Sequence, residues 1–163
     1  MWVCSCRPAA TLDSRDESLT GFVQQSLIVL QFPLFWYSCP ALLKEWIDLT
    51  FEHGFAYGEG GDRLHGKVLH LAVTTSGSSG AYTPGGHNHL DIRTFLTPFE
   101  QTARLSGMRF AAPYLLHGAL RADPAPHAAG FARLLAAWAA GRMGEDAFAR
   151  PILTHDTLLI TEG

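Results

Sequence analysis

The sequence predicts an α/β domain built around a parallel sheet. Apolar segments over residues 27–32 and 68–74 have the length and composition of strands covered on both faces, and a third lies near residues 110–117. Segments with helical periodicity separate them. Because strands that alternate with helices pair in parallel through right-handed crossovers, we expect the three strands to lie side by side in one sheet.

The first strand leads into an unusual loop. Pro33 ends the strand, because proline cannot donate a hydrogen bond to the sheet. Residues 34–37 are then all apolar or aromatic, where loop tips are ordinarily polar. A helix is expected over residues 40–52, with Leu43 and Ile47 on its apolar side. Ligands of open α/β sheets bind beyond the carboxyl ends of the strands, so an aromatic loop here predicts a planar, largely apolar ligand.

The rest of the chain repeats the pattern of strand and helix. A loop of small residues follows the second strand at residues 75–80. Asp91 is placed to cap a helix that runs to about residue 106, and Gly107 is placed to terminate it. A last amphipathic helix is expected over residues 126–141. The predicted order is therefore three strands, each followed by a helix.

The composition is that of one soluble domain. With 163 residues, 47% of them hydrophobic, the chain can bury a substantial core, and a net charge of −3 gives no electrostatic reason to expect nucleic acid as a partner. No apolar run reaches the roughly 18 residues that a membrane span needs. The first residues lack a charged leader followed by a long apolar core, so we expect a cytoplasmic location.

The three cysteines do not predict a metal site. Cys4 and Cys6 are separated by one residue, a poor spacing for a disulfide framework or a tetrahedral zinc site, and no matching Cys/His pair lies at the usual distances. Cys39 lies beside the aromatic loop, where a redox role or simple burial would both suit its position, and burial is the more usual state of a free cysteine.

Seven sequence blocks, taken together, resemble one protein family. The blocks are QFPLFWY at residues 31–37, PALLKEWID at 40–48, GFAYG at 54–58, LHGK at 64–67, TTSG at 74–77, YTPGGH at 82–87 and PFEQTA at 98–103. With these blocks in this order, the chain resembles the flavodoxin-like NAD(P)H:quinone oxidoreductases of the DT-diaphorase type. The bacterial relatives of that family include the ancillary quinone reductases of glutathione-regulated potassium-efflux systems.

The resemblance implies a fold, a reaction and partners. The fold is a flavodoxin-like three-layer sandwich with a parallel sheet, and the reaction is a two-electron, ping-pong hydride transfer from NAD(P)H to a quinone through bound FMN or FAD. Members of the family act as homodimers with the pocket at the subunit seam. The ancillary members further imply a membrane transporter as a partner, and hence a peripheral place at the inner membrane for a cytoplasmic protein.

The resemblance also implies which residues form the site. Tyr82 and His87 match the catalytic pair that stabilises negative charge on the cofactor, and His89 is a rival for the histidine. Glycine and serine in the second loop allow its backbone N–H groups to approach the ring closely. The residues expected to bind the cofactor are Pro33, Leu34, Phe35, Trp36 and Tyr37 of the first loop and Thr74, Thr75, Ser76 and Gly77 of the second.

The N-terminal part departs from the family pattern. Family members begin with a strand, a phosphate-binding loop and a helix, and residues 1–26 show no clear counterpart, so they are expected to be atypical and to lack the first strand–helix units. The flavodoxin-like domain is then expected over residues 27–142, followed by a C-terminal tail over 143–163. The strand at Leu27 would become an exposed apolar edge. An alternative function follows, in which the chain binds flavin poorly and acts as an inactive regulatory partner of a potassium-efflux transporter.

Overall fold

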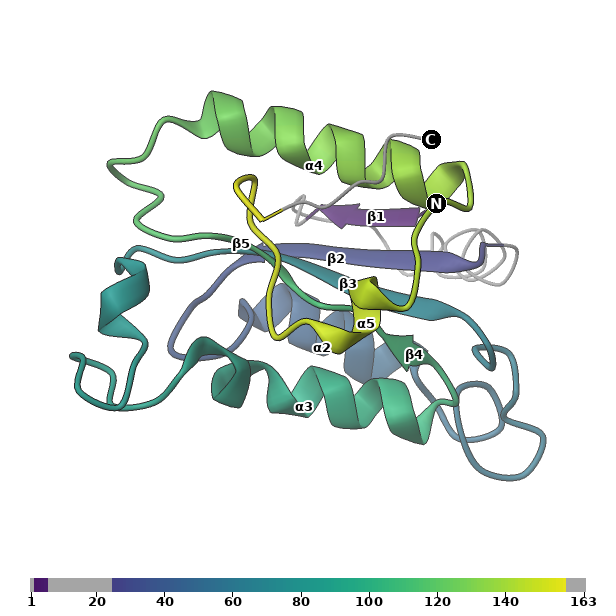
Figure 1. The fold of residues 1–163 in the computed structure, drawn as a ribbon. Helices are drawn as coiled ribbons and strands as arrows, with labels where there is room; N and C mark the ends of the chain where they lie inside the picture. The colour runs from purple at the N-terminus through teal and green to yellow at the C-terminus, as the bar shows by residue number, and fades with distance from the viewer. Residues whose placement is uncertain (1, 6–24, 158–163) are drawn as a thin grey trace.

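The computed structural model describes residues 2–5 and 25–157, which form a five-stranded sheet between two layers of helices (Figure 1). Helix α4 covers one face, and helices α2 and α3 cover the other. The predicted α/β architecture is therefore confirmed. The elements are β1 (Trp2–Ser5), β2 (Leu27–Pro33), α2 (Ala41–Thr50), β3 (Val68–Thr74), the 3-10 helix η2 (Ser79–Ala81), α3 (Ile92–Leu105), β4 (Arg109–Phe110), β5 (Tyr114–Leu116), α4 (Pro124–Ala139) and α5 (Asp146–Ala149).

All the strand pairs are parallel, in the order β1-β2-β3-β4, with β5 also paired to β3. Strands β2 and β3 are in register along their whole length, from Leu27 opposite Val68 to Pro33 opposite Thr74. Both strands therefore end at the same edge of the sheet. That edge carries the loops for which a ligand was predicted.

Strand β2 is not an exposed edge, so this prediction from the sequence was wrong. Strand β1 pairs with it in parallel, with Trp2 opposite Ile28 and Ser5 opposite Gln31. Four residues are few for a strand prediction, and Cys4 and Ser5 do not show the continuous apolar character of a buried strand. Residues 6–24, which include most of the segment predicted to be atypical, lie outside the described residues.

The predicted strand over residues 110–117 is divided into β4 and β5. Arg109 lies opposite Val68, but Tyr114 lies opposite Ala72, so one extra residue is accommodated between the two pairings. Pro113 lies in this interruption, where it has no N–H to give to the sheet and its carbonyl accepts a hydrogen bond from Leu153 instead. The extra residue and the proline together explain why one strand was predicted and two are found.

Alternate residues of β2 and β3 build two separate cores. Ile28, Leu30 and Phe32 face α2 and α3, in the same buried cluster as Leu43 and Leu96. On the opposite face, Leu27, Val29 and Ala72 pack with Phe131, Leu135 and Trp138 of α4. A strand buried on both faces reads as a continuous apolar run, which is the pattern found in the sequence.

The helices agree with the sequence prediction to within a few residues. The Asp91 carboxylate accepts a hydrogen bond of 3.1 Å from the Thr94 N–H and caps α3, as predicted. Helix α4 begins two residues earlier than expected, because Asp123 caps it through the Ala125 N–H. Helix α2 ends at Thr50, before the predicted end. None of the helices in the described ranges combines the length and apolar character needed to cross a membrane.

The segment after α4 returns to the sheet. Leu153 is 4% exposed and forms a parallel bridge with Tyr114. Its carbonyl accepts a hydrogen bond of 2.8 Å from the Leu115 N–H. The described part of the segment predicted as a tail, residues 143–157, is thus packed against β5.

His70 is a fully buried histidine on the α4 face of β3. Its ring centroid lies 6.4 Å from those of Phe131 and Trp138. Neither ring nitrogen has a hydrogen-bond partner among the described residues. Burial disfavours the charged form and lowers the pKa of His70 to about 4.

Acidification is expected to destabilise the fold through His70. Its folded pKa of about 4 lies below the unfolded value of 6.5, so the unfolded chain binds the proton more tightly and stability falls as the pH drops from 6.5 toward 4. Between pH 7 and pH 5 the loss is about 2 kcal/mol. His70→Leu should remove this part of the pH dependence, measured by urea unfolding at the two pH values.

The matched control is His89→Asn, which removes an exposed histidine at a left-handed position that asparagine tolerates. This variant should keep the full pH dependence. Burial also lowers the pKa values of His117 and His127, so some acid sensitivity remains in His70→Leu. An equal loss of stability in His70→Leu and the unchanged chain would assign the acid sensitivity to other groups.

Candidate functional site

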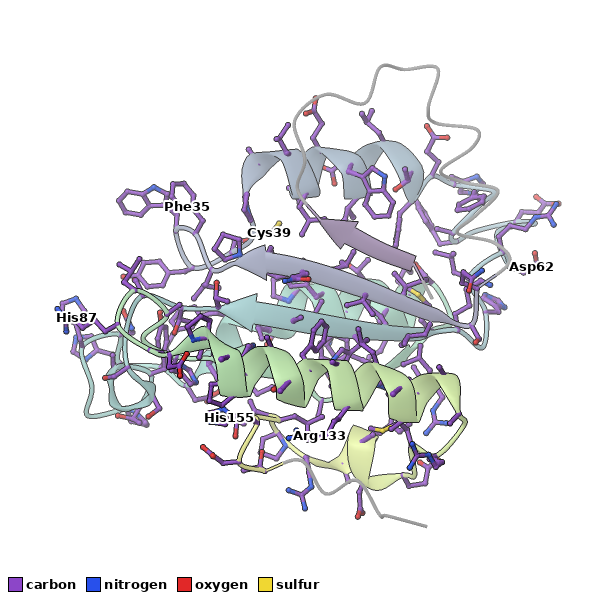
Figure 2. All side chains as sticks on the ribbon, turned by 90° about the horizontal axis from the view of Figure 1, so that it is seen from above. Phe35, Cys39, Asp62, His87, Arg133 and His155 are labelled. Atoms are coloured by element: carbon purple, nitrogen blue, oxygen red, sulfur yellow. The ribbon has the colours of Figure 1, made fainter. Side chains whose placement is uncertain are left out.

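The two predicted loops meet at the carboxyl edge of the sheet. The Leu34 N–H donates a 2.7 Å hydrogen bond to the carbonyl of Thr74, and the Thr75 N–H donates one of 2.9 Å to the carbonyl of Leu116. These bonds link the residues that follow β2, β3 and β5. Phe35 and His87 accordingly lie at the same end of the molecule, opposite Asp62 (Figure 2).

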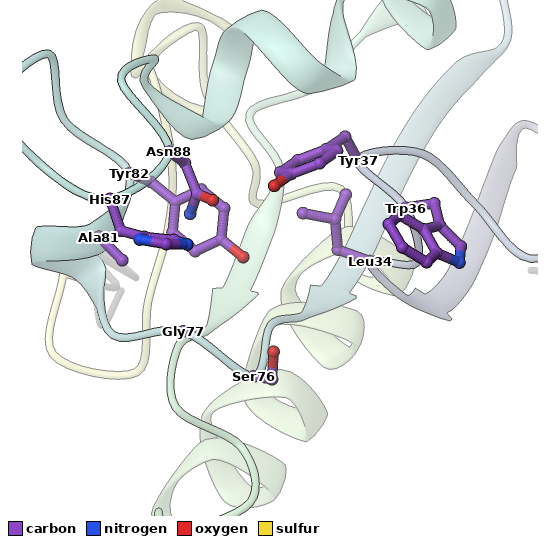
Figure 3. Close-up of a pocket in the computed structure, with 9 residues that line it drawn as sticks. All are labelled: Leu34, Trp36, Tyr37, Ser76, Gly77, Ala81, Tyr82, His87 and Asn88. Carbon is purple, nitrogen blue, oxygen red and sulfur yellow. The ribbon is translucent and has the colours of Figure 1, made fainter.

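A pocket of about 300 Å³ opens between the loops (Figure 3). It brings together residues from three stretches of the chain that the sequence singled out, and adds two that it did not, Ala81 and Asn88. The lining residues are Leu34, Trp36, Tyr37, Ser76, Gly77, Ala81, Tyr82, His87 and Asn88.

Four residues predicted to bind a cofactor do not line this pocket. Pro33 and Thr74 form the last pair of the β2–β3 ladder. Thr75 is 2% exposed and lies beneath its loop. The Phe35 side chain is 59% exposed and projects from the loop into solvent (Figure 2). These residues support the pocket or lie outside it, because only part of a loop can face one cavity.

The turn over residues 35–38 has a strained backbone. Phe35 and Ser38 exchange two backbone hydrogen bonds, of 2.8 and 3.0 Å. Between them, Trp36 and Tyr37 have φ angles of +47° and +63°. Tight turns with two left-handed residues favour Asn and Gly, and the left-handed conformation costs other residues roughly 1–2 kcal/mol each. Two large aromatic residues held in this conformation indicate a functional constraint on the loop.

The second loop presents free hydrogen-bond donors. Within the described part of the chain, the backbone N–H groups of Ser76 and Gly77 have no hydrogen-bond acceptor, although both residues line the pocket. A side chain at Gly77 would crowd the Tyr82 ring, since an added Cβ would lie 3.2 Å from its Cε2 atom. The loop therefore offers two adjacent donors to a ligand with acceptor atoms along one edge.

Tyr82 forms the opposite wall. It is 9% exposed, and its ring makes contacts with Phe95 and His117 at centroid separations of 6.1 and 5.6 Å. Phe95 also contacts Tyr37, at 5.1 Å. One residue of α3 thus supports an aromatic side chain on each side of the pocket, and both tyrosine hydroxyls point toward its centre (Figure 3).

Of the two candidate histidines in the loop after η2, His87 lines the pocket and His89 does not. His89 is exposed, with a φ of +59°. The loop is closed by a 2.9 Å hydrogen bond from the Asn88 N–H to the carbonyl of Ala81. Gly86 is required here, because a Cβ at this position would lie 2.2 Å from the carbonyl oxygen of Gly80. No pattern in the sequence marks Ala81 or Asn88, which reach the pocket only because this loop folds back.

The pocket suits a planar heterocycle. Leu34, Trp36 and Tyr37 supply apolar and aromatic surface, and the second loop supplies two N–H donors. A phenol and an imidazole stand on the far side, where they can stabilise negative charge on a bound ring. Within the described residues there is no group of three or more potential metal ligands.

Comparison with known proteins identifies the family. A family described as having a flavodoxin-like fold matches residues 7–141. The chain belongs to this family. The resemblance drawn from the seven sequence blocks is thereby confirmed, and so is the flavodoxin-like fold, with its parallel sheet between helices.

Three relatives are 46% identical to this chain where they align. They are general stress protein 14 and an uncharacterized NAD(P)H oxidoreductase, YrkL, both of Bacillus subtilis (strain 168), and the potassium-efflux ancillary protein KefG of Serratia proteamaculans (strain 568). The aligned parts cover 63%, 57% and 62% of this chain, respectively. They cover 62%, 53% and 55% of the relatives, so the chain spans less than two thirds of their length.

Two solved structures share the fold and about a third of the aligned residues. An NADPH-quinone reductase from P. pentosaceus has a TM-score of 0.66 at 32% identity, covering 76% of this chain and 71% of that one. General stress protein 14 of Treponema denticola, solved in complex with FMN, has a TM-score of 0.61 at 31% identity, covering 63% and 59%.

Trp36→Asn is expected to stabilise the fold. Asparagine tolerates the left-handed backbone, and the indole, which is 83% exposed, contributes little packing. The free energy of unfolding should rise by about 1 kcal/mol, and the midpoint of thermal unfolding by about 2–4 °C. Trp36→Ala is the control, because it removes the same ring without favouring the turn. Equal midpoints for the two variants would show that the turn stores no strain.

Proposed function

We propose that this chain is a flavin-dependent oxidoreductase that transfers hydride from NAD(P)H to a quinone. The observation that carries the proposal is the pair of N–H groups at Ser76 and Gly77, which have no acceptor among the described residues and belong to residues that line one pocket with Tyr82 and His87. Support also comes from the names of the relatives, an NAD(P)H oxidoreductase and an NADPH-quinone reductase. The FMN bound to the Treponema denticola protein favours FMN over FAD.

The residues of the pocket have distinct roles in this proposal. A bound flavin would supply the two-electron redox chemistry that couples oxidation of NAD(P)H to reduction of a quinone in alternate half-reactions. The N–H groups of Ser76 and Gly77 would hold the polar edge of the ring by donating hydrogen bonds to its oxygen and nitrogen atoms. Leu34, Trp36 and Tyr37 cover its apolar surface and exclude water.

Tyr82 and His87 stabilise the negative charge that develops in the pocket on reduction. The phenol can donate a hydrogen bond to that charge from a buried ring that packs against Phe95. The His87 imidazole, exposed at the rim, can donate a second hydrogen bond to the same charge. The two groups thus contribute electrostatic stabilisation.

Two measurements test the proposal. FMN should bind saturably, which is seen as quenching of its fluorescence, and the loaded protein should oxidise NADH or NADPH with 1,4-benzoquinone as acceptor. Loss of both signals would overturn the proposal. Light scattering in the same samples tests whether two copies associate, as the resemblance implies.

A regulatory role beside a potassium-efflux transporter is the second candidate. It is supported by the relatives named KefG, which are ancillary proteins of such a system. Phe35 and Trp36 are 59% and 83% exposed and offer an aromatic surface for protein contact beside the pocket. In this case FMN would bind weakly and quinone reduction would be absent, although the fold is intact.

The double variant Tyr82→Phe, His87→Ala is expected to slow reduction of bound FMN on the order of 100-fold, because the groups that stabilise the charge are removed. The FMN content should stay nearly unchanged, since the Ser76 and Gly77 donors remain. Stopped-flow absorbance after mixing with NADPH measures the rate in a single turnover.

His89→Asn is the matched control, because His89 lies outside the pocket, two residues from His87, and asparagine tolerates its left-handed backbone. It should be reduced at the rate of the unchanged protein. If the double variant were also reduced at that rate, Tyr82 and His87 would be assigned to loop structure only.

A further inference from the structure

His117 contacts the second loop from behind. It follows β5, and its Nδ1 lies 3.0 Å from the Thr75 hydroxyl oxygen. The same hydroxyl lies 2.8 Å from the carbonyl oxygen of Gly77, to which it donates. Thr75 is 2% exposed, so water does not compete for these bonds.

The protons in this chain of contacts can be assigned. A threonine hydroxyl has one hydrogen, and Gly77 O can only accept, so the hydrogen lies toward Gly77. Both contacts are then hydrogen bonds only if His117 donates from Nδ1. Burial lowers the pKa of His117 and so favours the neutral ring, and a neutral ring that carries its hydrogen on Nδ1 satisfies both contacts.

The backbone after His117 also binds the second loop. The Gly118 N–H donates to the carbonyl of Gly77 and the Ala119 N–H to that of Thr75, each at 2.9 Å. These bonds attach the loop through its carbonyl groups, and the Ser76 and Gly77 N–H groups have no hydrogen-bond acceptor among the described residues. His117 contacts the side chain of Thr75 from outside the loop, whereas the Thr83 hydroxyl donates to the carbonyl of Gly80 at the other end of the loop.

His117 also contacts the catalytic candidate. Its ring centroid lies 5.6 Å from that of Tyr82, with 39° between the planes. It does not line the pocket that holds Trp36 and Ser76, but a second cavity of about 250 Å³ on the other side of Tyr82. Any influence on a ligand in the pocket therefore passes through Thr75 and Tyr82.

We propose that His117 is a positioning residue, whose Nδ1–H tautomer holds Thr75 and thereby directs the Ser76 and Gly77 N–H groups into the pocket. The part of the proposal that concerns flavin rests on the proposed function. The hydrogen-bond chain itself is a property of the protein without a ligand, so it can be tested separately.

NMR of the imidazole nitrogens tests the tautomer directly. In the ¹⁵N-labelled protein near pH 7, His117 should show a protonated Nδ1 and an unprotonated Nε2. In Thr75→Val, which removes the hydroxyl at nearly constant volume, this preference should disappear. A His117 ring protonated on Nε2 in the unchanged protein would overturn the proposal, whether or not FMN binds.

A pair of amide variants then tests the consequence for binding. Asparagine can place its N–H₂ group near the position of Nδ1, whereas glutamine places it near Nε2. His117→Asn should keep the FMN dissociation constant within about 3-fold of the unchanged protein, and His117→Gln should raise it roughly 10-fold. The Ser76 and Gly77 amide signals should shift in His117→Gln and stay in place in His117→Asn.

The outcomes separate the two proposals. If the unchanged protein fails to bind FMN, the proposed function fails, and the tautomer and the Ser76 and Gly77 amide signals still decide the role of His117. If the unchanged protein binds FMN and both amide variants bind it equally well, His117 has no positioning role. Rescue by asparagine alone distinguishes positioning from a general loss of stability.

Discussion

The site depends on the parallel register of β2 and β3. Because Pro33 lies opposite Thr74, both strands end at one level, and the Leu34 N–H continues the ladder by bonding the Thr74 carbonyl. A shift of one residue would turn the faces of β2 over and separate the aromatic loop from the small-residue loop. Backbone hydrogen bonds between the strands therefore fix the position of the pocket, and the side chains and N–H groups of the loops supply its polar and aromatic groups.

The two helical layers contribute to the site unequally. On the side of α2 and α3, Phe95 contacts both Tyr37 and Tyr82, so core packing extends without a break to the pocket walls. On the side of α4, the sheet face contains His70, a polar ring with no hydrogen-bond partner among the described residues. The first layer thus orders the aromatic groups, and the second contains a group that makes the fold sensitive to acid.

Much of this architecture could be predicted from apolar periodicity and turn residues, and the sequence blocks led to Trp36, Ser76 and Tyr82 at the pocket. The predictions failed where contacts between residues distant in the sequence determine the local structure. Strand β1 is too short for its pattern to be recognised, and its pairing with β2 is visible only in space. The loop that brings Asn88 to the pocket closes through a single backbone bond to Ala81, which no residue pattern encodes. The support by His117 likewise joins positions 42 residues apart.

The bridge between Tyr114 and Leu153 joins two residues that are synthesised at different times. Strand β5 precedes His117, and the Leu115 N–H is paired only when Leu153 has reached the sheet. During translation the segment that carries Leu153 leaves the ribosome after all the pocket residues, so the nascent chain can form β2 and β3 while β5 is still unpaired on one side. Strand β5 therefore gains its second neighbour only after every residue of the pocket has been synthesised.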